Sequence, residues 1–367
     1  MNILVVGSNG FIGKNLSTQL KLHNKNVFFI TKRTNKKEFK LKVNRADIIF
    51  HLAGSNIEKN KNNFKINNVD LTKDISDPLE KKNKIVKIIY ASTIHHNKSN
   101  IYGKTKKKAE NILKNINNKN IKVIILRLPN IYGKWSKPNY NSAIATFCYK
   151  ISRNEKINIE RNKKITLYYI DDLVTYLISL IRAKFNKNKI IKNFKYLKNT
   201  DLKFIIDTLN DFKKLDVNEL PQNISDNFIK KLYSTYIYFS PRKKLNTKIK
   251  KITDNRGEFV ELIKTKKLGQ FSLLKIYPNK IRGNHFHNTK IENFFILKGI
   301  VKFYYTDLFN NKKNSFIVKG SNLNRVTTVP GVLHRIKNIG KKDALLVIWT
   351  NEIFDPNKPD TYNLDTK

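Results

Sequence analysis

A glycine-rich loop between a strand and a helix is the feature that most constrains the fold of this chain. The apolar run Ile3–Val6 is followed by Gly7, Gly10 and Gly13 in a GxxGxxG pattern, and helical spacing begins after Gly13. Glycine lets the backbone turn sharply and lets a pyrophosphate approach the helix N-terminus. In this strand–loop–helix context the pattern predicts a dinucleotide-binding site, and the alternative is an ordinary glycine-rich turn.

The second predicted strand, Val27–Ile30, is followed by residues that indicate which dinucleotide the site prefers. Lys32 and Arg33 lie where an NAD site usually has an acidic residue that holds the ribose 2′-hydroxyl. Cations at this place favour NADP(H), because its 2′-phosphate needs a positive partner. The alternative is that both residues are ordinary surface charges of a basic chain.

Apolar strands alternate with helical segments along the rest of the first region. Strands are predicted at 47–54, 85–90 and 123–128. This alternation is typical of a parallel, doubly wound sheet. Tyr102 and Lys106 are expected to share one face of the helix predicted over 102–113. His51 is expected to be a packing residue, and Asp171 is expected to cap the helix that follows it.

The pattern changes near residue 250, where short alternating runs replace the helices. Strands are predicted at 270–277, 292–297, 301–305, 315–318 and 345–350, with Gly, Pro and Asn between them. Short strands at this regular spacing are typical of a β-sandwich or a β-barrel. A joint is predicted over 233–250, so we expect one domain at 1–245 and a second at 246–367.

Three histidines and a carboxylate stand out in the second region. His285 and His287 are one residue apart, so on a strand they point to the same face. Glu292 follows after a short turn, and His334 lies further along the chain. These residue types can converge on one divalent metal ion. The alternative is that the histidines line a barrel interior or bind a substrate directly, without metal.

The composition limits the partners and the compartment. Lys and Arg number 73 against 28 Asp and Glu, which gives a formal net charge of +45. Because the lysines are spread over the whole length, we expect no nucleic-acid partner, and whether the charge has a function stays open. A single cysteine, Cys148, excludes an internal disulfide. With no signal peptide and no apolar run near the ~20 residues that span a bilayer, a cytoplasmic protein is expected.

Four motifs of the first region occur together and in order. They are the glycine loop, the His-Leu-Ala-Gly strand end at 51–54, the YxxxK pair Tyr102 and Lys106, and Arg-Leu-Pro-Asn at 127–130. Together they resemble the extended short-chain dehydrogenases/reductases that act on nucleotide sugars. The resemblance implies an α/β Rossmann-type doubly wound parallel sheet that binds NADPH. It places around the cofactor Gly7, Gly10, Phe11, Ile12, Gly13, Lys32, Arg33, Leu52, Ala53, Gly54, Asn68, Tyr102, Lys106 and Pro129.

The same resemblance implies the catalytic roles. Tyr102 gives a proton to a carbonyl oxygen as hydride arrives from the nicotinamide, while Lys106 lowers the pKa of the phenol and anchors the cofactor ribose. A further hydroxyl polarises the carbonyl, and alignment with the family pattern puts it at Thr93, with Ser92 as the alternative. Only eight residues separate Thr93 from Tyr102, which is shorter than in most extended members.

The second region carries two motifs at a characteristic separation. The first is HxHx4Ex6G at 285–299, and the second is Gx2Hx3N at 331–338. Together they resemble the two motifs of the cupins, which implies an all-β cupin barrel after the first domain. The metal ligands implied are His285, His287, Glu292 and His334, and zinc is the expected ion. Which cupin residue is the catalytic base, and whether the metal is catalytic or structural, stays open.

The order of the two regions is itself distinctive. With the strings PNYNSAIATFC, KLYSTY, RGEF, GNHFHNTK and NEIFDPNKPDTYNL, the chain resembles the bifunctional CapF/WbjC-type enzymes of bacterial capsule and O-antigen synthesis from end to end. The resemblance implies C3 epimerisation of a UDP-4-keto-6-deoxy-N-acetylhexosamine by the cupin. NADPH-dependent C4 reduction then gives UDP-2-acetamido-2,6-dideoxy-L-talose, on the route to UDP-N-acetyl-L-fucosamine. A homodimer is expected. The alternative is a simple NADP-dependent nucleotide-4-ketosugar reductase/epimerase with a structural or dimerising cupin.

Overall fold

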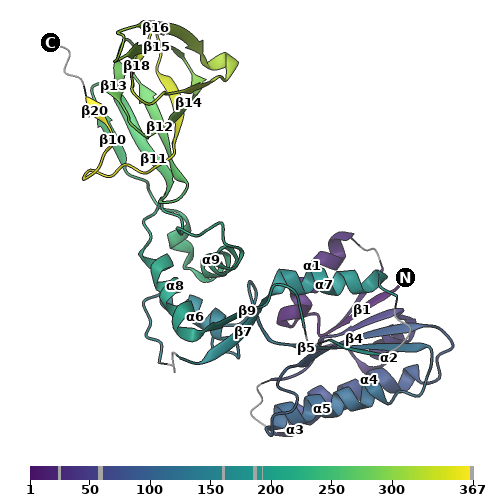
Figure 1. Cartoon of the computed structure of the whole chain (residues 1–367). Coiled ribbons are helices and arrows are strands. Elements are labelled where there is room, and N and C mark those ends of the chain that lie inside the picture. Colours follow the sequence, from purple (N-terminus) through teal and green to yellow (C-terminus); the bar gives the residue numbers. More distant parts are fainter. Residues whose placement is uncertain (24–25, 57–60, 159–161, 185–187, 192, 364–367) are drawn as a thin grey trace. The chain divides into compact units, whose positions relative to one another are not determined.

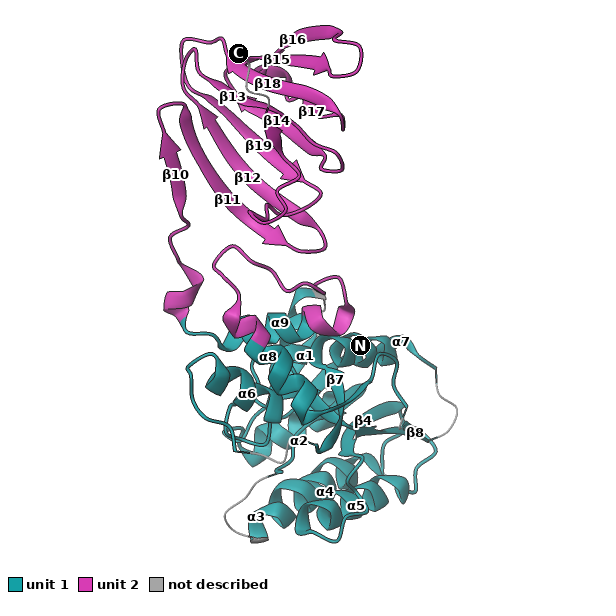
Figure 2. Ribbon diagram, turned by 60° about the vertical axis from the view of Figure 1, so that its left-hand side comes forward, with its two compact units in different colours: residues 1–210, 231–241 teal, residues 211–230, 242–367 magenta. Residues whose placement is uncertain are grey.

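The computed structural model describes residues 1–23, 26–56, 61–158, 162–184, 188–191 and 193–363, and the chain divides into two compact units. Unit 1 comprises Met1–Asn210 and Lys231–Pro241, and unit 2 comprises Asp211–Lys230 and Arg242–Lys367 (Figure 2). The chain therefore enters unit 2 for its final stretch close to the boundary predicted between residues 245 and 246. The segment 211–230 lies inside the predicted first domain but groups with unit 2.

A six-stranded parallel sheet forms the centre of unit 1 (Figure 1). Its strand order is β2-β1-β3-β4-β5-β8, and every neighbouring pair is parallel. Most of its strands are short apolar runs, as expected where helices cover both faces of a sheet. The bounds are β1 Ile3–Val6, β2 Val27–Ile30, β3 Ile48–His51, β4 Val86–Thr93, β5 Ile121–Leu128 and β8 Lys189–Ile191.

Helices pack on both faces of this sheet, and a hydrophobic cluster fills each side. On one face lie α1 (Phe11–His23) and α7 (Ile170–Arg182). On the other face lie α2 (Lys36–Arg45), α4 (Leu71–Ser76) and α5 (Ile101–Lys114). The predicted doubly wound parallel fold of the first region is therefore confirmed.

The remaining elements of unit 1 lie beyond the main sheet. They are α3 (Lys61–Lys65), the π-helix Ile66–Asp70, a 3-10 turn Asp77–Leu79, α6 (Ala143–Ile151), and a small sheet of β6 (Asn130–Tyr132), β7 (Lys164–Tyr169) and β9 (Lys198–Asp201). Two further helices, α8 (Leu202–Lys214) and α9 (Asn227–Phe239), cross the boundary between the units, because residues 211–230 group with unit 2. The helix α9 continues to Phe239, so the joint predicted from residue 233 begins later than expected. The prediction that Asp171 caps α7 is wrong, because Tyr169 is the N-cap residue and Asp171 lies in the first turn, paired with Lys134.

Unit 2 consists mainly of two antiparallel sheets packed around one hydrophobic core. The six-stranded sheet contains, in spatial order, β10 (Lys251–Asp254), β11 (Gly257–Thr265), β12 (Gly269–Ile276), β19 (Ala344–Thr350), β14 (Glu292–Lys298) and β17 (Arg325–Thr327). The five-stranded sheet contains β16 (Lys313–Lys319), β15 (Ile300–Asp307), β18 (Val332–Asn338), β13 (Ile281–Phe286) and β20 (Tyr362–Asn363). The all-β prediction is confirmed. A closed barrel is not shown, because hydrogen bonds among the described residues leave two separate sheets.

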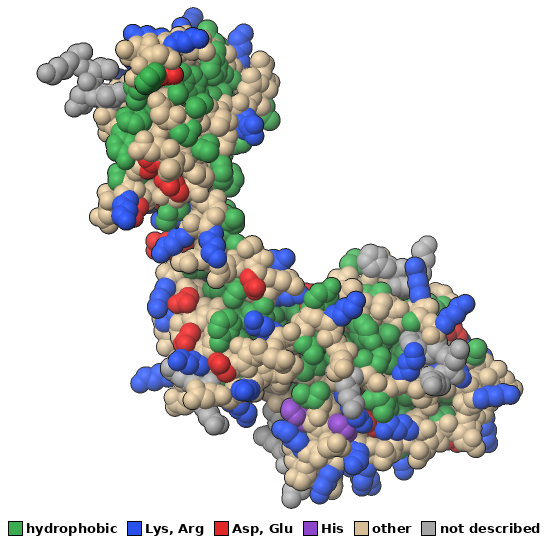
Figure 3. All heavy atoms as spheres, viewed as in Figure 1, with side chains coloured by type: hydrophobic (Ala, Val, Ile, Leu, Met, Phe, Trp, Pro, Cys, Tyr) green, Lys and Arg blue, Asp and Glu red, His purple; other side chains and the backbone are tan. Residues whose placement is uncertain are grey.

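Two surface properties complete the description. On the face drawn in Figure 3, Lys and Arg side chains are scattered over both units and do not form a single stripe. Within the part of the chain that the structure describes, no helix combines the length and apolar character needed to cross a membrane.

Candidate active site and metal centre

The glycine loop joins β1 to α1 and closes tightly on itself. Gly7 has a φ of +89°, and its carbonyl oxygen accepts a hydrogen bond from the N–H of Gly10 at 2.9 Å. A Cβ at Gly13 would lie only 2.0 Å from the same oxygen. The helix α1 begins at Phe11 with no acidic residue in its first turn, so its N-terminal N–H groups favour an anion. This cradle fits the pyrophosphate of a dinucleotide.

The other residues predicted to contact a cofactor lie along one edge of the sheet, at the carboxyl ends of its strands. They are Phe11 and Ile12 at the start of α1, Lys32 and Arg33 after β2, Leu52, Ala53 and Gly54 after β3, and Pro129 after β5. Lys32 and Arg33 are exposed. Ligands of doubly wound sheets bind outside this edge. The fold therefore brings these predicted cofactor residues together at one edge of the parallel sheet.

Asn68 is buried in the π-helix Ile66–Asp70 and ties the turn after β3 to α5. Its side-chain oxygen accepts from Ser55 N at 2.8 Å, and its NH₂ group donates to Ser55 O at 3.0 Å and to Thr105 Oγ1 at 3.1 Å. Gly54 faces this amide, because a Cβ there would lie 2.8 Å from Asn68 Oδ1. Single π-turns of this kind are frequent at functional sites.

Tyr102 lies in the first turn of α5, beside Thr93 at the end of β4. Burial raises the pKa of the Tyr102 phenol, and a side-chain hydrogen bond with Thr93 opposes the rise. Thr93 is thus the neighbour that lowers this pKa, whereas Lys106 was expected to do so. The other candidate hydroxyl, Ser92 Oγ, donates to Glu110 Oε1 at 2.6 Å. The phenol of Tyr102 is therefore paired with Thr93, whereas the hydroxyl of Ser92 is engaged by Glu110.

Lys106 is buried one helical turn after Tyr102, with 6% of its surface exposed. Its Nζ donates to Ala91 O at 2.8 Å and lies 4.7 Å from the centre of the Tyr90 ring. Burial lowers the pKa of Lys106 to about 8, and the charge of Glu110 opposes that shift. His51 is fully buried against Tyr90, in keeping with the packing role expected for it.

A buried carboxylate beneath this site was missed at the sequence level. Glu110 is fully buried and accepts hydrogen bonds from Ser92 Oγ, and from Arg127 Nε and Nη2 at 3.1 and 2.6 Å. Burial raises the pKa of Glu110, but Arg127 and Ser92 outweigh this effect and hold the pKa below its ordinary value. Because Glu110 lies four residues after Lys106 on α5, the helical spacing was a signal that could have found it.

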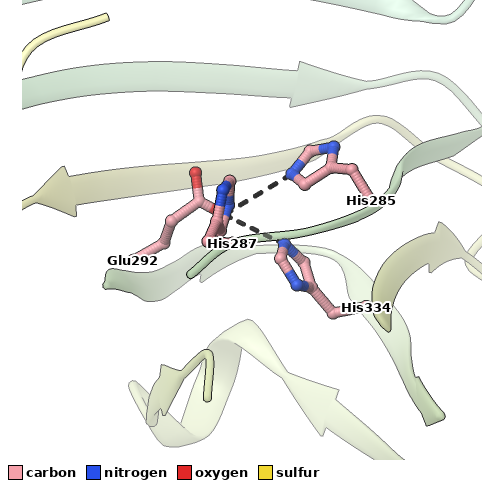
Figure 4. A group of neighbouring side chains, drawn as sticks. All are labelled: His285, His287, Glu292 and His334. Carbon is pink, nitrogen blue, oxygen red and sulfur yellow. Dashed lines mark hydrogen bonds and ion pairs between the residues drawn. The ribbon is translucent and has the colours of Figure 1, made fainter. Parts of the chain in front are cut away.

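The four predicted metal ligands of unit 2 converge from three strands and a loop. His285 lies on β13, His287 directly follows that strand, Glu292 begins β14 and His334 lies on β18. Figure 4 shows the four side chains pointing toward one another. One possible ligand atom from each residue lies within 4.8 Å of the others. A bulge at Asn284, whose φ is +83°, sets the register that places His285 opposite His334.

The donor atoms of this cluster fit a divalent cation. Glu292 Oε2 lies 3.1 Å from Nε2 of His334, 3.5 Å from that of His287 and 3.9 Å from that of His285. The Nε2 atoms of His285 and His287 are buried and have no hydrogen-bond partner among the described residues. Burial raises the pKa of Glu292, but the three histidines outweigh it and hold the pKa well below its ordinary value. Ligation would satisfy the orphaned ring nitrogens.

Comparison with known proteins finds a family match for each of the two units. Residues 3–192 match the NAD dependent epimerase/dehydratase family, and residues 252–362 match the polysaccharide biosynthesis C-terminal domain. The UDP-2-acetamido-2,6-beta-L-arabino-hexul-4-ose reductase of Pseudomonas aeruginosa strain PA103 is 34% identical over 365 residues, which is 99% of this chain and 98% of that protein. The chain belongs to the NAD dependent epimerase/dehydratase family. Membership implies an enzyme with a nicotinamide cofactor, which the glycine loop fits.

Solved structures show that this family member is CapF-like along its whole length. The capsular polysaccharide assembling protein CapF from Staphylococcus aureus is 35% identical, with a TM-score of 0.87 and 100% of both chains covered. The spore coat polysaccharide biosynthesis protein SpsL of Bacillus subtilis is 26% identical over 123 residues, 31% of this chain and 82% of that protein. MoeE5 in complex with UDP-glucuronic acid and NAD covers 65% of this chain at 16% identity and a TM-score of 0.55, which shows the fold alone.

Proposed function

We propose that the protein is a bifunctional enzyme acting on a UDP-4-keto-6-deoxy-N-acetylhexosamine. Unit 2 epimerises C3, and unit 1 reduces the C4 ketone with NADPH to give UDP-2-acetamido-2,6-dideoxy-L-talose, on the route to UDP-N-acetyl-L-fucosamine. The observation that carries the proposal is the Tyr102–Thr93 pair at the cofactor edge of a chain that also holds the His/Glu cluster. The Pseudomonas relative, whose name is that of a hexul-4-ose reductase, supports the substrate class.

The reduction assigns one role to each residue of the Tyr102 site. When bound, NADPH supplies a hydride to the ketone carbon. Thr93 donates a hydrogen bond to the ketone oxygen, and Tyr102 gives that oxygen its proton. Because burial raises the pKa of Tyr102, the phenol carries its proton at neutral pH. The ammonium of Lys106, one turn further along α5, stabilises the negative charge that remains on Tyr102.

The preference for NADPH over NADH follows from the end of β2. Lys32 and Arg33 are exposed there, on the side of the glycine loop where the adenine ribose of a dinucleotide lies. We propose that both side chains bind the 2′-phosphate of NADPH. No acidic residue stands in the Thr31–Thr34 turn to receive a 2′-hydroxyl.

We assign the epimerisation to unit 2, which we propose to be a cupin. A C4 ketone acidifies the proton on C3, so removal of that proton and its return from the other face inverts the carbon. A divalent ion, for which we propose zinc, supplies positive charge when bound. The residues that hold it are His285, His287, Glu292 and His334, with Glu292 kept ionised by the surrounding rings. We further propose that the enzyme is a cytoplasmic homodimer.

NMR of the product formed in deuterated water tests both steps. The UDP-4-keto-6-deoxy-N-acetylhexosamine is incubated with the protein and NADPH, and the product is expected to be the L-talose derivative with deuterium at C3. A product that keeps its original C3 configuration and its C3 proton contradicts the epimerase assignment. That outcome favours a simple ketosugar reductase whose C-terminal unit is structural.

Matched variants separate the two sites. Tyr102→Phe should abolish NADPH oxidation by the ketosugar while C3 deuterium exchange and NADPH binding persist, and Tyr176→Phe on α7 is the control for loss of a phenol elsewhere in unit 1. His287→Ala should abolish C3 exchange and leave reduction of a pre-epimerised ketone intact. Turnover by Tyr102→Phe at the wild-type rate is incompatible with its role as proton donor.

A further inference from the structure

We propose that residues 359–363 form a C-terminal strap that positions His287 in the metal centre, with Asp360 as the positioning residue. The inference rests on the metal site of the proposed function and adds residues that lie outside the two cupin-like motifs at 285–299 and 331–338. The strap approaches the cluster from the far end of the chain. It contacts the turn after His287, at 288–290, and the strand that carries His285.

The first contact fixes the protonation of the His287 ring. Nδ1 of His287 lies 2.6 Å from the backbone oxygen of Asp360. A carbonyl oxygen only accepts, so Nδ1 must carry the proton and donate it. In the neutral ring Nε2 then has a free lone pair, and it is Nε2 that faces Glu292 at 3.5 Å. A backbone carbonyl behind a histidine ligand orients the ring and makes it a better donor to a metal.

The second contact holds the loop that carries His287. The Asp360 carboxylate accepts hydrogen bonds from the N–H groups of Asn288, Thr289 and Lys290 at 3.0, 2.8 and 2.7 Å, and from Thr289 Oγ1 at 3.0 Å. These bonds outweigh the effect of burial and hold the pKa of Asp360 below its ordinary value. Asp360 has a φ of +37°, a conformation uncommon for a residue with a side chain. That backbone turn directs its carbonyl and its carboxylate at the same loop.

Contacts on both sides of Asp360 anchor the strap. The buried ammonium of Lys290 donates to Pro359 O at 2.6 Å and to Thr361 Oγ1 at 3.3 Å. Beyond Asp360, β20 pairs with β13, so that Asn363 lies opposite His285 and Tyr362 opposite Phe286. The strap therefore touches the segments of two ligands. His334 differs, because its Nδ1 lies 3.4 Å from the oxygen of Val332 in its own strand.

Metal binding by side-chain variants tests the inference. Asp360→Ala removes four hydrogen bonds to the His287 turn and should weaken zinc binding ~10- to 100-fold, the usual effect of losing an outer-shell partner. Asp355→Ala is the matched control, because Asp355 lies in the same C-terminal segment and its side chain accepts only from Asn357 N, at 2.9 Å, among the described residues. The control should bind zinc as the wild type does. Affinity is measured by competition with a chelator, and metal content by elemental analysis.

Two further readouts distinguish positioning from general stability. The visible absorption of the cobalt-loaded protein reports ligand geometry, and it should change in Asp360→Ala but not in Asp355→Ala. The rise in Tm on adding zinc to metal-free protein should shrink in Asp360→Ala, whereas a purely structural role lowers both Tm values together. Asp360→Asn keeps the side-chain volume and one acceptor oxygen, so it should show a smaller loss and decides the question if Asp360→Ala does not fold.

The outcomes separate the inference from the proposed function. Wild-type zinc affinity and an unchanged cobalt spectrum in a folded Asp360 variant would overturn the role of the strap while leaving the metal site intact. A wild-type protein that binds no zinc or cobalt would overturn both. NADPH binding to unit 1 should be unchanged in every variant, which confirms that the loss is confined to unit 2.

Discussion

The glycine loop allows a sharp prediction, because one substitution at two of its glycines should have two different consequences. Gly13→Ala places a Cβ 2.0 Å from the oxygen of Gly7 and 2.9 Å from the Cα of Ser8. Gly10→Ala places a Cβ no closer than 3.2 Å to the same oxygen. Neither glycine is in the positive-φ region, so the difference is one of space and not of backbone strain. Replacing Gly13 should therefore destabilise the fold, whereas replacing Gly10 should mainly weaken cofactor binding.

The magnitude follows from the overlap. Non-bonded carbon contacts are optimal at about 3.5–4.0 Å, so a Cβ at Gly13 forces the loop away from α1. Overpacking a tight interior costs about 1–3 kcal/mol and occasionally more, and we place Gly13→Ala near 3 kcal/mol because the atom it meets is backbone. In a domain of 150–250 residues that lowers the Tm by ~6–12 °C, whereas the ≲1 kcal/mol expected for Gly10→Ala lowers it by at most ~2–4 °C.

Thermal unfolding and NADPH fluorescence titration together test this reasoning. Gly10→Ala should unfold close to the wild-type temperature but bind NADPH at least ~10-fold more weakly, which corresponds to ~1.4 kcal/mol, because its methyl group occupies the approach to the pyrophosphate. Gly13→Ala should lose both stability and binding. A Gly13→Ala protein with the wild-type Tm would refute the packing argument. Wild-type NADPH affinity in Gly10→Ala would refute the cofactor assignment of the loop.

Three further predictions concern the chemistry of unit 1. Thr93→Ala should lower kcat by ~10²-fold or more, as when an oxyanion donor is lost, whereas Ser92→Ala should cost mainly stability, and equal kcat losses would contradict the distinction. Burial lowers the pKa of Lys106 to about 8, so its side chain loses the proton and the positive charge above pH 8. The kcat/KM for reduction should therefore fall as the pH rises past 8. A pH–rate profile that stays flat well above pH 8 would refute the role of the Lys106 ammonium. Replacing Lys32 and Arg33 by Ala should raise KM for NADPH ~10- to 100-fold and leave KM for NADH unchanged, and an unchanged ratio would refute the preference.

Local sequence patterns predicted much of the fold. The predicted strands Ile3–Val6 and Val27–Ile30 match β1 and β2 residue for residue, because each is a short apolar run bounded by polar or glycine residues. The strands of unit 2 that have strong apolar runs were also predicted. The strands β10, β11, β17, β18 and β20 were not predicted. Arg325–Thr327 and Tyr362–Asn363 are very short, Lys251–Asp254 is mostly polar, and β11 and β18 mix polar with apolar residues. Asp171 was misplaced because a capping residue and a first-turn residue look alike in sequence.

The residues of the two sites were likewise predictable from the sequence where they lie close together in the chain. The glycine loop, the YxxxK pair and the HxHx4E motif each lie within a few residues of sequence, and local geometry relates the members of each. The structure brings His334 to the other metal ligands through β18, which pairs with β13. A motif at the right separation made that convergence foreseeable. The contact between the Ser92 hydroxyl and Glu110, which lies 18 residues away, was not predicted from the sequence.

The sequence alone therefore determined which chemistry the chain carries: a strand–glycine–helix cradle, a phenol with a lysine one turn away, and an imidazole-rich cluster. These features depend on spacing within one element, which helix and strand periodicity fix. Only the tertiary structure decided which side chains and backbone groups contact and orient these residues. Glu110 meets Arg127 across 17 residues and His287 meets Asp360 across 73. Such partners are chosen by how strands pair and pack, and no local period encodes that choice.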